Sequence, residues 1–270
     1  MDDIEEKRVY GDRAGKTELL VAAALGVLSV EASADHVGRF GVVHRCDPVD
    51  VATGAGLVAI ATDDDVLLRG PTSNSFRETA FGPAAAVAVD DTVIAADPDG
   101  RVARLDGIGE DLDDGRTSSH DWSELGTIDA EVRAIDPPLL ASEDGVRRLP
   151  GLDYVGLDDD YDVAAVGPLA ATGNCLYSLG NGWIDELEGA FRVATAADDA
   201  AHAATDATLY ERQSGEWVTD DLPVDSPVVD VAYSEVTYAV TEDGVLLTEG
   251  DDGWRAHPLG VEGVVGCAVR

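Results

Sequence analysis

The densest set of chemically reactive side chains in the sequence occupies four consecutive positions, His44, Arg45, Cys46 and Asp47. Arg133 stands out separately, because it is the one cation within the small apolar runs that we assign below as innermost strands. A guanidinium donates forked hydrogen bonds to carboxylates and other anionic or polar groups. We therefore predict a ligand-binding site made by His44, Arg45, Asp47 and Arg133. The alternative is that Arg45 pairs with Asp47 or another carboxylate and that Cys46 is simply packed.

No metal site is predicted. His44 and Cys46, with His36 as a distant third ligand, lack the four ligands and the closely spaced pairs that zinc sites prefer. Three aspartate-rich runs offer oxygen ligands, but none has the alternating spacing of a calcium loop. We interpret these runs as solvated acidic loops. They are Asp63–Asp65, Asp111–Asp114 and Asp158–Asp160.

No catalytic motif is apparent either. The sequence lacks a GxSxG nucleophile elbow, a phosphate-binding loop and a dinucleotide fingerprint. Its five histidines are scattered, and none has a serine or cysteine partner that the sequence identifies. We therefore predict no cofactor and no catalytic residue.

A cluster of cations lies near the start of the chain, after its first acidic residues. Residues 1–16 form an N-terminal arm in which four of the eighteen cations fall within ten residues, together with one tyrosine. We expect this arm to dock on the acidic body of the same molecule, since opposite charge is close at hand, or to grip a partner. Its candidate residues are Lys7, Arg8, Tyr10, Arg13 and Lys16.

The overall charge is strongly negative. Asp and Glu total 54 against 18 Lys and Arg, which gives a formal net charge of −36. Such a chain repels nucleic-acid phosphates and anionic lipid surfaces, because binding them requires clustered Lys and Arg. The composition therefore argues against nucleic-acid and membrane partners and leaves a protein, or a small polar or anionic ligand.

The acidic residues also predict the salt concentration in which the protein works. Only Lys7 and Lys16 are lysines, and the acid is spread along the chain, as in proteins that work in molar salt, where charges are screened within about 3 Å. A localised acidic surface for a basic partner is the alternative. The three cysteines form no framework of disulfides, and the acidic N-terminus is unlike a signal peptide. We predict a cytoplasmic protein of a halophile.

The strands that must position the candidate binding residues are predicted from a repeat in the sequence. Two apolar runs separated by a short turn recur seven times, about every 36 residues, and three copies close on a Gly-rich turn followed by Trp. Asp-Gly and Gly-Asn in the turns are typical of hairpins. Such a period suits compact four-stranded propeller blades, with small apolar innermost strands.

The two ends of the repeat complete each other. The final innermost strand, within residues 264–269, has no strands after it, whereas the first hairpin, around Gly26, lacks an innermost strand before it. We therefore predict an all-β, seven-bladed β-propeller over residues 17–270, closed by the C-terminal strand joining the N-terminal blade. Six or eight blades are the alternatives, because one gap of 45 residues could hide an irregularity.

Three segments, within this acidic seven-fold repeat, resemble an uncharacterised haloarchaeal β-propeller family. They are Lys7-Arg8-Val9-Tyr10-Gly11, Gly15-Lys16-Thr17 and Gly41-Val42-Val43-His44-Arg45-Cys46-Asp47. The resemblance covers the whole chain. It implies a propeller without an assigned activity and adds no catalytic residue.

Two functions remain open from the sequence. The leading hypothesis is a non-enzymatic binding or scaffold propeller whose loops present a polar, acidic face to a protein or small ligand. The alternative is a hydrolase or lyase with its site in the central opening, around His44, Arg45 and Arg133. Convergence of these three side chains on one pocket would favour the enzyme.

Overall fold

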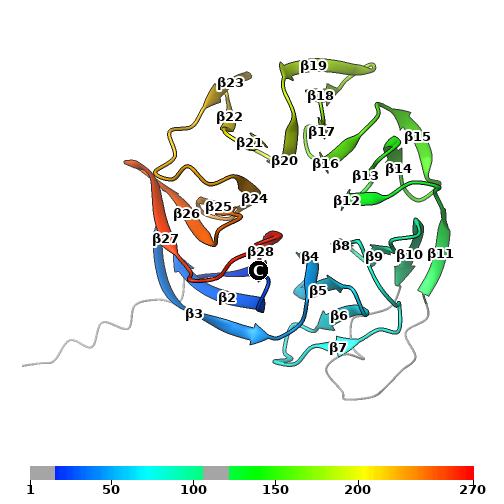
Figure 1. Cartoon of the computed structure of the whole chain (residues 1–270), viewed down its shortest axis with the longest axis horizontal. Helices are drawn as coiled ribbons and strands as arrows, with labels where there is room; N and C mark the ends of the chain where they lie inside the picture. Colours follow the sequence, from blue (N-terminus) through cyan, green and yellow to red (C-terminus); the bar gives the residue numbers. More distant parts are fainter. Residues whose placement is uncertain (1–15, 106–121) are drawn as a thin grey trace, which may run out of the picture.

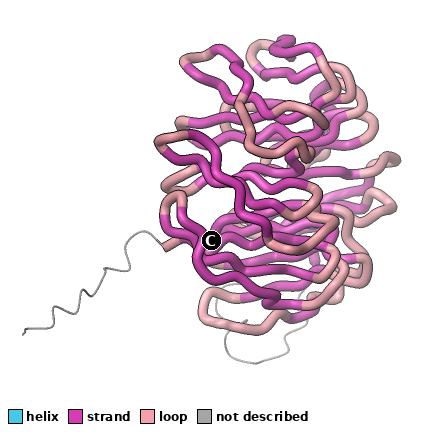
Figure 2. Tube along the Cα trace, turned by 60° about the vertical axis from the view of Figure 1, so that its left-hand side comes forward, coloured by secondary structure: helices cyan, strands magenta, loops and turns pink. Residues whose placement is uncertain are grey.

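A computed structural model of the chain describes residues 16–105 and 122–270. These residues form seven sheets of four antiparallel strands, arranged as blades around a central opening (Figure 1). Strands and loops account for all of the described trace, and it contains no helix (Figure 2). The predicted seven-bladed propeller is therefore confirmed.

Each blade runs from an innermost strand beside the axis to an outermost strand at the rim. The innermost strands are β28 (Gly266–Val269), β4 (Pro48–Gly54), β8 (Ala86–Val89), β12 (Val132–Asp136), β16 (Asp160–Ala164), β20 (Phe191–Ala197) and β24 (Val228–Tyr233). The second strands are β1 (Thr17–Ala23), β5 (Leu57–Thr62), β9 (Val93–Ala96), β13 (Leu139–Ser142), β17 (Leu169–Thr172), β21 (Ala200–Thr205) and β25 (Thr237–Thr241). We number the blades 1 to 7 in this order.

The third and fourth strands complete the blades. The third strands are β2 (Gly26–Ser33), β6 (Val66–Arg69), β10 (Arg101–Leu105), β14 (Gly145–Arg148), β18 (Cys175–Leu179), β22 (Leu209–Gln213) and β26 (Val245–Gly250). The outermost strands are β3 (His36–His44), β7 (Arg77–Glu78), β11 (Trp122–Thr127), β15 (Asp153–Gly156), β19 (Trp183–Glu188), β23 (Glu216–Thr219) and β27 (Gly253–Pro258).

A threonine or serine fixes the turn between the second and third strands in five blades. Its hydroxyl donates to a backbone carbonyl three or four residues later, which satisfies a buried polar group and tightens the turn. These bonds join Thr62 to Asp65, Ser142 to Gly145, Thr172 to Cys175, Thr205 to Thr208 and Thr241 to Val245. In two of the Asp-Gly turns, Gly100 and Gly244 have φ of +85° and +81°. An added Cβ there would lie 2.0 Å from a backbone oxygen, so only glycine fits.

The hydrophobic core is divided among the blade interfaces. Each of the seven interfaces holds its own cluster of buried apolar side chains. The largest cluster, thirteen residues, joins blades 7 and 1, and the smallest, five residues, joins blades 4 and 5. The ring is therefore held together by packing between neighbours as well as within each blade.

The ring closes where the sequence predicts. Strand β28 pairs antiparallel with β1, placing Val269 opposite Leu19 and Cys267 opposite Val21. Backbone N–H of Arg270 donates to the carbonyl of Glu18 at 2.8 Å, which extends the pairing by one residue. Blade 1 is thus built from both ends of the described chain.

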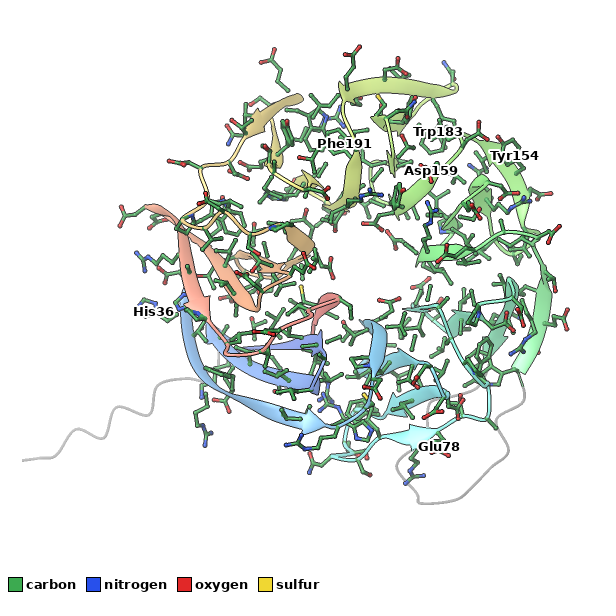
Figure 3. The ribbon with its side chains drawn as sticks, in the orientation of Figure 1. His36, Glu78, Tyr154, Asp159, Trp183 and Phe191 are labelled. Atoms are coloured by element: carbon green, nitrogen blue, oxygen red, sulfur yellow. The ribbon has the colours of Figure 1, made fainter. Side chains whose placement is uncertain are left out.

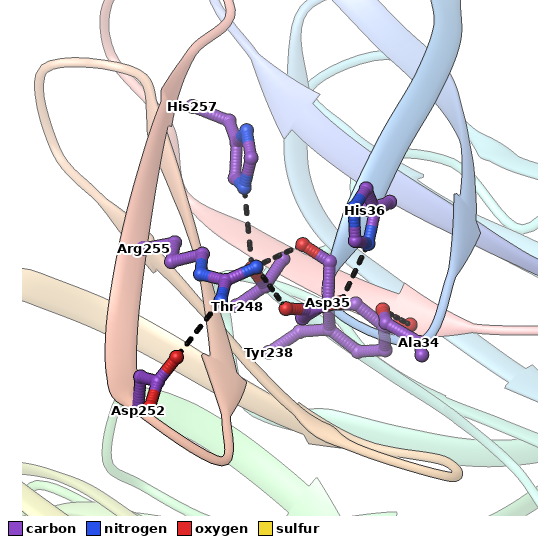
Figure 4. A network of polar contacts seen from close by, with 8 residues as sticks. All are labelled: Ala34, Asp35, His36, Tyr238, Thr248, Asp252, Arg255 and His257. Atoms are coloured by element: carbon purple, nitrogen blue, oxygen red, sulfur yellow. Dashed lines mark hydrogen bonds and ion pairs between the residues drawn. The ribbon is translucent and has the colours of Figure 1, made fainter.

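A polar network at the rim reinforces the same seam (Figure 4). Asp35, in the turn between β2 and β3, accepts a hydrogen bond from Arg255 of β27. Its backbone carbonyl accepts from the Thr248 hydroxyl at 3.0 Å, and the Tyr238 hydroxyl donates to the carbonyl of Ala34 at 3.3 Å. Blades 7 and 1 are therefore joined by polar contacts in addition to their shared apolar cluster, to which Tyr238 itself belongs.

Candidate functional site

The innermost strands carry irregularities that direct side chains toward the axis. In five of them the pairing with the second strand skips one residue near the start of the strand. Such a bulge re-aims the skipped side chain. The skipped residues are Val49, Arg133, Tyr161, Arg192 and Val229. All five line a central cavity of about 320 Å³, into which side chains of the innermost strands project (Figure 3).

Two arginines flank one tyrosine in this cavity. Arg133 comes from blade 4, Tyr161 from blade 5 and Arg192 from blade 6. The guanidinium carbons lie 4.3 and 3.8 Å from the centroid of the Tyr161 ring. These distances add to 8.1 Å, the largest separation that the two carbons can have. Stacking of this kind stabilises the guanidinium groups while leaving their edges able to donate.

The two arginines differ in their remaining contacts. Arg133 donates to the Asp159 carboxylate at 2.8 Å and to the backbone carbonyl of Asp160 at 3.2 Å. Asp159, labelled in Figure 3, directly precedes β16. Arg192 has a carboxylate of Asp206 at 3.9 Å and a side chain that is 40% exposed. Arg192 is therefore the more accessible cation of the pair.

Carboxylates occupy the next positions along the innermost strands. Asp50, Asp162 and Asp230 directly follow Val49, Tyr161 and Val229, and all three line the cavity. Each accepts hydrogen bonds from the next residue of its own strand and from the innermost strand of the next blade. The accepting pairs are Asp50 with Val51 and Val87, Asp162 with Val163 and Ala194, and Asp230 with Val231 and Cys267, at 2.7 to 2.9 Å.

A fourth carboxylate lies further along β12. Asp136 lines the same cavity and accepts from the backbone N–H of Ala165 at 2.7 Å. Burial raises the pKa of all four carboxyls, and for Asp230 the pKa reaches about 7. The bonded amides oppose this rise, because they stabilise the ionised form. The cavity therefore combines guanidinium groups at one level with partly neutralised carboxyls at the next.

The sequence-predicted binding residues do not all meet here. Arg133 lines the cavity, whereas His44, Arg45 and Asp47 are absent from its described lining. The His44 ring lies against Phe76, with centroids 4.9 Å apart, and Arg45 and Asp47 are exposed. The three side chains whose convergence would favour an enzyme are thus not gathered in this pocket.

The basic arm is placed only at its last residue. Lys16 is exposed just before β1, and Lys7, Arg8, Tyr10 and Arg13 lie outside the described residues. Among residues 16–105 and 122–270, no group of three or more His, Cys, Asp or Glu side chains is arranged to hold a metal ion. The same part of the chain contains no helix long and apolar enough to span a membrane.

Two aspartates contradict the interpretation of the aspartate runs as solvated loops. Asp65 is buried, and its carboxylate accepts backbone N–H groups from Val66, Phe81 and Gly82 within 3.1 Å. Asp160 is fully buried at the start of β16. The run Asp111–Asp114 lies outside the described residues. The sequence of an aspartate run does not show that its last residue lies at the buried start of a strand, as Asp160 does, or directly before one, as Asp65 does. These two residues were missed for that reason.

A separate buried polar cluster joins blades 6 and 7. His202 Nδ1 lies 2.9 Å from the Tyr233 hydroxyl, which donates to the carbonyl of Thr195 at 3.2 Å. The hydroxyl therefore accepts hydrogen from Nδ1, which leaves Nε2 unprotonated, 3.9 Å from Asp220. Burial lowers the pKa of His202 to about 4, so the ring is neutral at neutral pH. This cluster links two blades, and of its members only Thr195 also lines the central cavity.

The cavity-lining residues that sequence reasoning missed are Tyr161, Arg192 and the cavity aspartates. A signal for them exists, because a triplet ending in Asp-Val recurs in register on three innermost strands. The copies are Val49-Asp50-Val51, Tyr161-Asp162-Val163 and Val229-Asp230-Val231. A polar residue recurring at one strand position in a ring of blades indicates a shared place at the axis.

The fold is shared with solved structures of low sequence identity. A chain from a nidogen/laminin complex is 10% identical with a TM-score of 0.61, covering 94% of this chain and 98% of that one. The WD40 propeller domain of Doa1 is 14% identical with a TM-score of 0.63, covering 83% and 86%. Apo AztD from Citrobacter koseri is 10% identical with a TM-score of 0.57, covering 92% and 84%. At these identities the likeness concerns the fold alone.

Among curated proteins none matches the sequence. A family model does match, over residues 3–270, and its description reads "Beta-prop_HVO_0234:-like, beta propeller". That family is named after a Haloferax protein, in agreement with the resemblance found in the sequence. The chain therefore belongs to this β-propeller family.

Proposed function

We propose that the protein is a non-enzymatic binding propeller whose central cavity takes a small zwitterion, a molecule with an anionic group at one end and an amine at the other. The observation that carries this proposal is the order of charges along the axis. Guanidinium groups of Arg133 and Arg192 stand at the level of the bulges, and the carboxyls of Asp162 and Asp136 follow by one and three strand positions.

The distances fit a compact ligand. Strand residues advance about 3.3 Å each, so the carboxyls lie roughly 3 to 10 Å beyond the guanidinium level. A carboxylate bound edge-on by Arg192 would allow an amine a few carbons away to reach Asp162 or Asp136. The cavity volume, about 320 Å³, lies at the small end of ligand pockets.

Binding accounts for these groups better than hydrolysis does. Both oxygens of Asp50, Asp162 and Asp230 already accept backbone amides. A general base needs a free oxygen directed at the proton that it removes. A cationic amine beside these carboxyls favours their ionised form. The ionised carboxyls then attract the amine through space, because Coulomb attraction needs no free lone pair.

Arg192 provides the test of this proposal. We expect Arg192→Gln to weaken binding of an ω-amino acid by roughly 10- to 100-fold, since it removes charged hydrogen bonds to the carboxylate. Calorimetric titration in molar potassium chloride, with 4-aminobutyrate and 6-aminohexanoate as probes, measures this. Butyrate and butylamine, which carry one charge each, should bind more weakly than the zwitterions.

A matched control exists in the same blade. Arg212 stacks on Trp217 and has Glu186 at 3.5 Å, and it does not line the cavity. Arg212→Gln should leave the affinity unchanged. Equal affinity for Arg192→Gln and the native protein, or failure of every zwitterion to bind, would refute the proposal.

A further inference from the structure

The outermost strand of blade 1 differs from the other rim strands. Strand β3 is nine residues long and ends its sheet, pairing only with β2 among the described strands. Phe40, Val42 and Val43 are 46%, 39% and 41% exposed. A long edge strand with exposed apolar side chains offers unpaired backbone groups to another strand. Proteins normally blunt such edges with charge, and in β3 the one Arg, Lys, Asp or Glu is Arg39, whose side chain is 89% exposed.

The charge pattern around β3 is also unusual for this chain. No Asp or Glu occurs between His36 and Cys46, although one residue in five of the whole sequence is acidic. Five of the other six outermost strands contain at least one acidic residue. Two copies that each carry −36 repel at most surfaces, and β3 is a place where they can meet without opposing carboxylates.

We propose that two copies of this chain associate through β3, pairing antiparallel about a twofold axis at Gly41. Between its two bulges β3 is regular at Phe40, Gly41 and Val42, which lie opposite Val30, Ser29 and Leu28. In the proposed register, Phe40 of each copy lies opposite Val42 of the other copy, so this pair forms once on each side of the axis. Aromatic and β-branched side chains form favourable cross-strand pairs, and a twofold axis requires such a self-complementary patch.

Glycine at the axis suits close approach of two backbones. An added Cβ at Gly41 meets nothing within 4 Å in the described part of this chain. Because a strand Cβ points out of the plane of its sheet, that face of the sheet is uncovered at Gly41. The joined blades would form one eight-stranded sheet. A strand-sized interface lies at the small end of stable contacts, so we expect a dissociation constant of about micromolar order.

Sedimentation equilibrium in molar potassium chloride, across the micromolar range, tests the association. Val42→Asp places one carboxylate from each copy beside the axis and should raise the dissociation constant by roughly 100-fold or more. Ile184→Asp is the control, because Ile184 is equally apolar and 55% exposed on the rim strand β19. That variant should dimerise like the native protein, and thermal unfolding should show both variants folded.

Cross-linking tests the register. In a Cys46→Ser background, oxidation of Gly41→Cys should give a disulfide-linked dimer, whereas Gly182→Cys, at an equally open and exposed turn, should not. A monomer at all concentrations, or equal dimerisation of Val42→Asp and Ile184→Asp, would refute the interface. A dimer whose Gly41→Cys variant does not cross-link would refute the twofold axis at Gly41. Zwitterion binding at the cavity does not enter either measurement.

Discussion

Replacing Asp160 with asparagine is expected to stabilise the protein, and by more as the pH rises. The side chain of Asp160 is fully buried, and neither carboxylate oxygen has a hydrogen-bond partner in the described part of the chain. The residues paired with the corresponding turn Thr or Ser in four other blades are Pro48, Val132, Phe191 and Val228. A carboxyl therefore occupies a position that other blades fill with apolar side chains.

The pH dependence follows from the pKa of this carboxyl. Burial, followed by the charges of Asp159 and Asp158, raises the pKa of Asp160 from 3.8 to about 8. The folded protein thus holds this proton more tightly than the unfolded chain does. The contribution to stability is fully present below the unfolded value and is lost as the pH rises toward about 8. Asparagine does not titrate, so it removes this loss.

The measurement is the free energy of unfolding by denaturant at several pH values in molar potassium chloride. The advantage of Asp160→Asn should grow by about 1.4 kcal/mol per pH unit between roughly pH 5.5 and pH 8. Asp160→Val should show the same slope with a larger gain, because it also removes the buried polar group. Asp64→Asn, an equal charge change at an exposed turn residue, should show no such slope. A flat difference between Asp160→Asn and native protein would contradict the burial of an ionisable carboxyl there.

A single cysteine in β1 is expected to lock the ring covalently. Val21 lies opposite Cys267 in the pairing of β1 with β28, and both belong to the apolar cluster of blades 7 and 1. Arg270 and Glu18 form a hydrogen-bonded pair, so by alternation Val21 and Cys267 form a non-hydrogen-bonded pair. Side chains approach most closely in such pairs, with Cα atoms about 4.5 Å apart. That spacing suits a disulfide.

Oxidised Val21→Cys should therefore be more stable than its reduced form by up to about 5 kcal/mol, because the bond closes almost the whole chain into one loop. Denaturant unfolding with and without reductant measures the difference, and mass spectrometry identifies the bond. Val21→Cys combined with Cys267→Ser is the control and should not respond to reductant. Failure of the two thiols to join under oxidising conditions would mean that β28 does not lie beside β1 as described.

The architecture was predictable because it repeats. Hairpin turns such as those at Gly100 and Gly244 recur at similar spacing, and their chemistry is local and readable from single residues. Ring closure was predictable from the order of strands. The last innermost strand has no second, third or fourth strand after it, whereas the first hairpin has no innermost strand before it, so the two complete one blade. Both inferences depend on the order of strands and turns along the chain, which can be read directly from the sequence.

The central site was predicted only at Arg133. Expecting small apolar innermost strands hid Tyr161 and Arg192, whose direction depends on a skipped residue in the strand pairing. A bulge is a property of two paired strands, and one strand's sequence does not display it. The His44–Asp47 segment does not line this cavity, for a different reason. Reactive side chains adjacent in sequence need not face the axis when they connect a rim strand to the next blade.

Blade 1 imposes an order on how the molecule can be completed during translation. Roughly 240 residues separate the end of β1 from the start of β28. At about 5 to 20 residues per second, the ribosome needs on the order of 12 to 50 s to add them. During that time β1 has been synthesised, but the strand that pairs with its inner edge, β28, has not. The nascent chain must therefore keep one unfinished sheet from pairing elsewhere until β28 has left the exit tunnel.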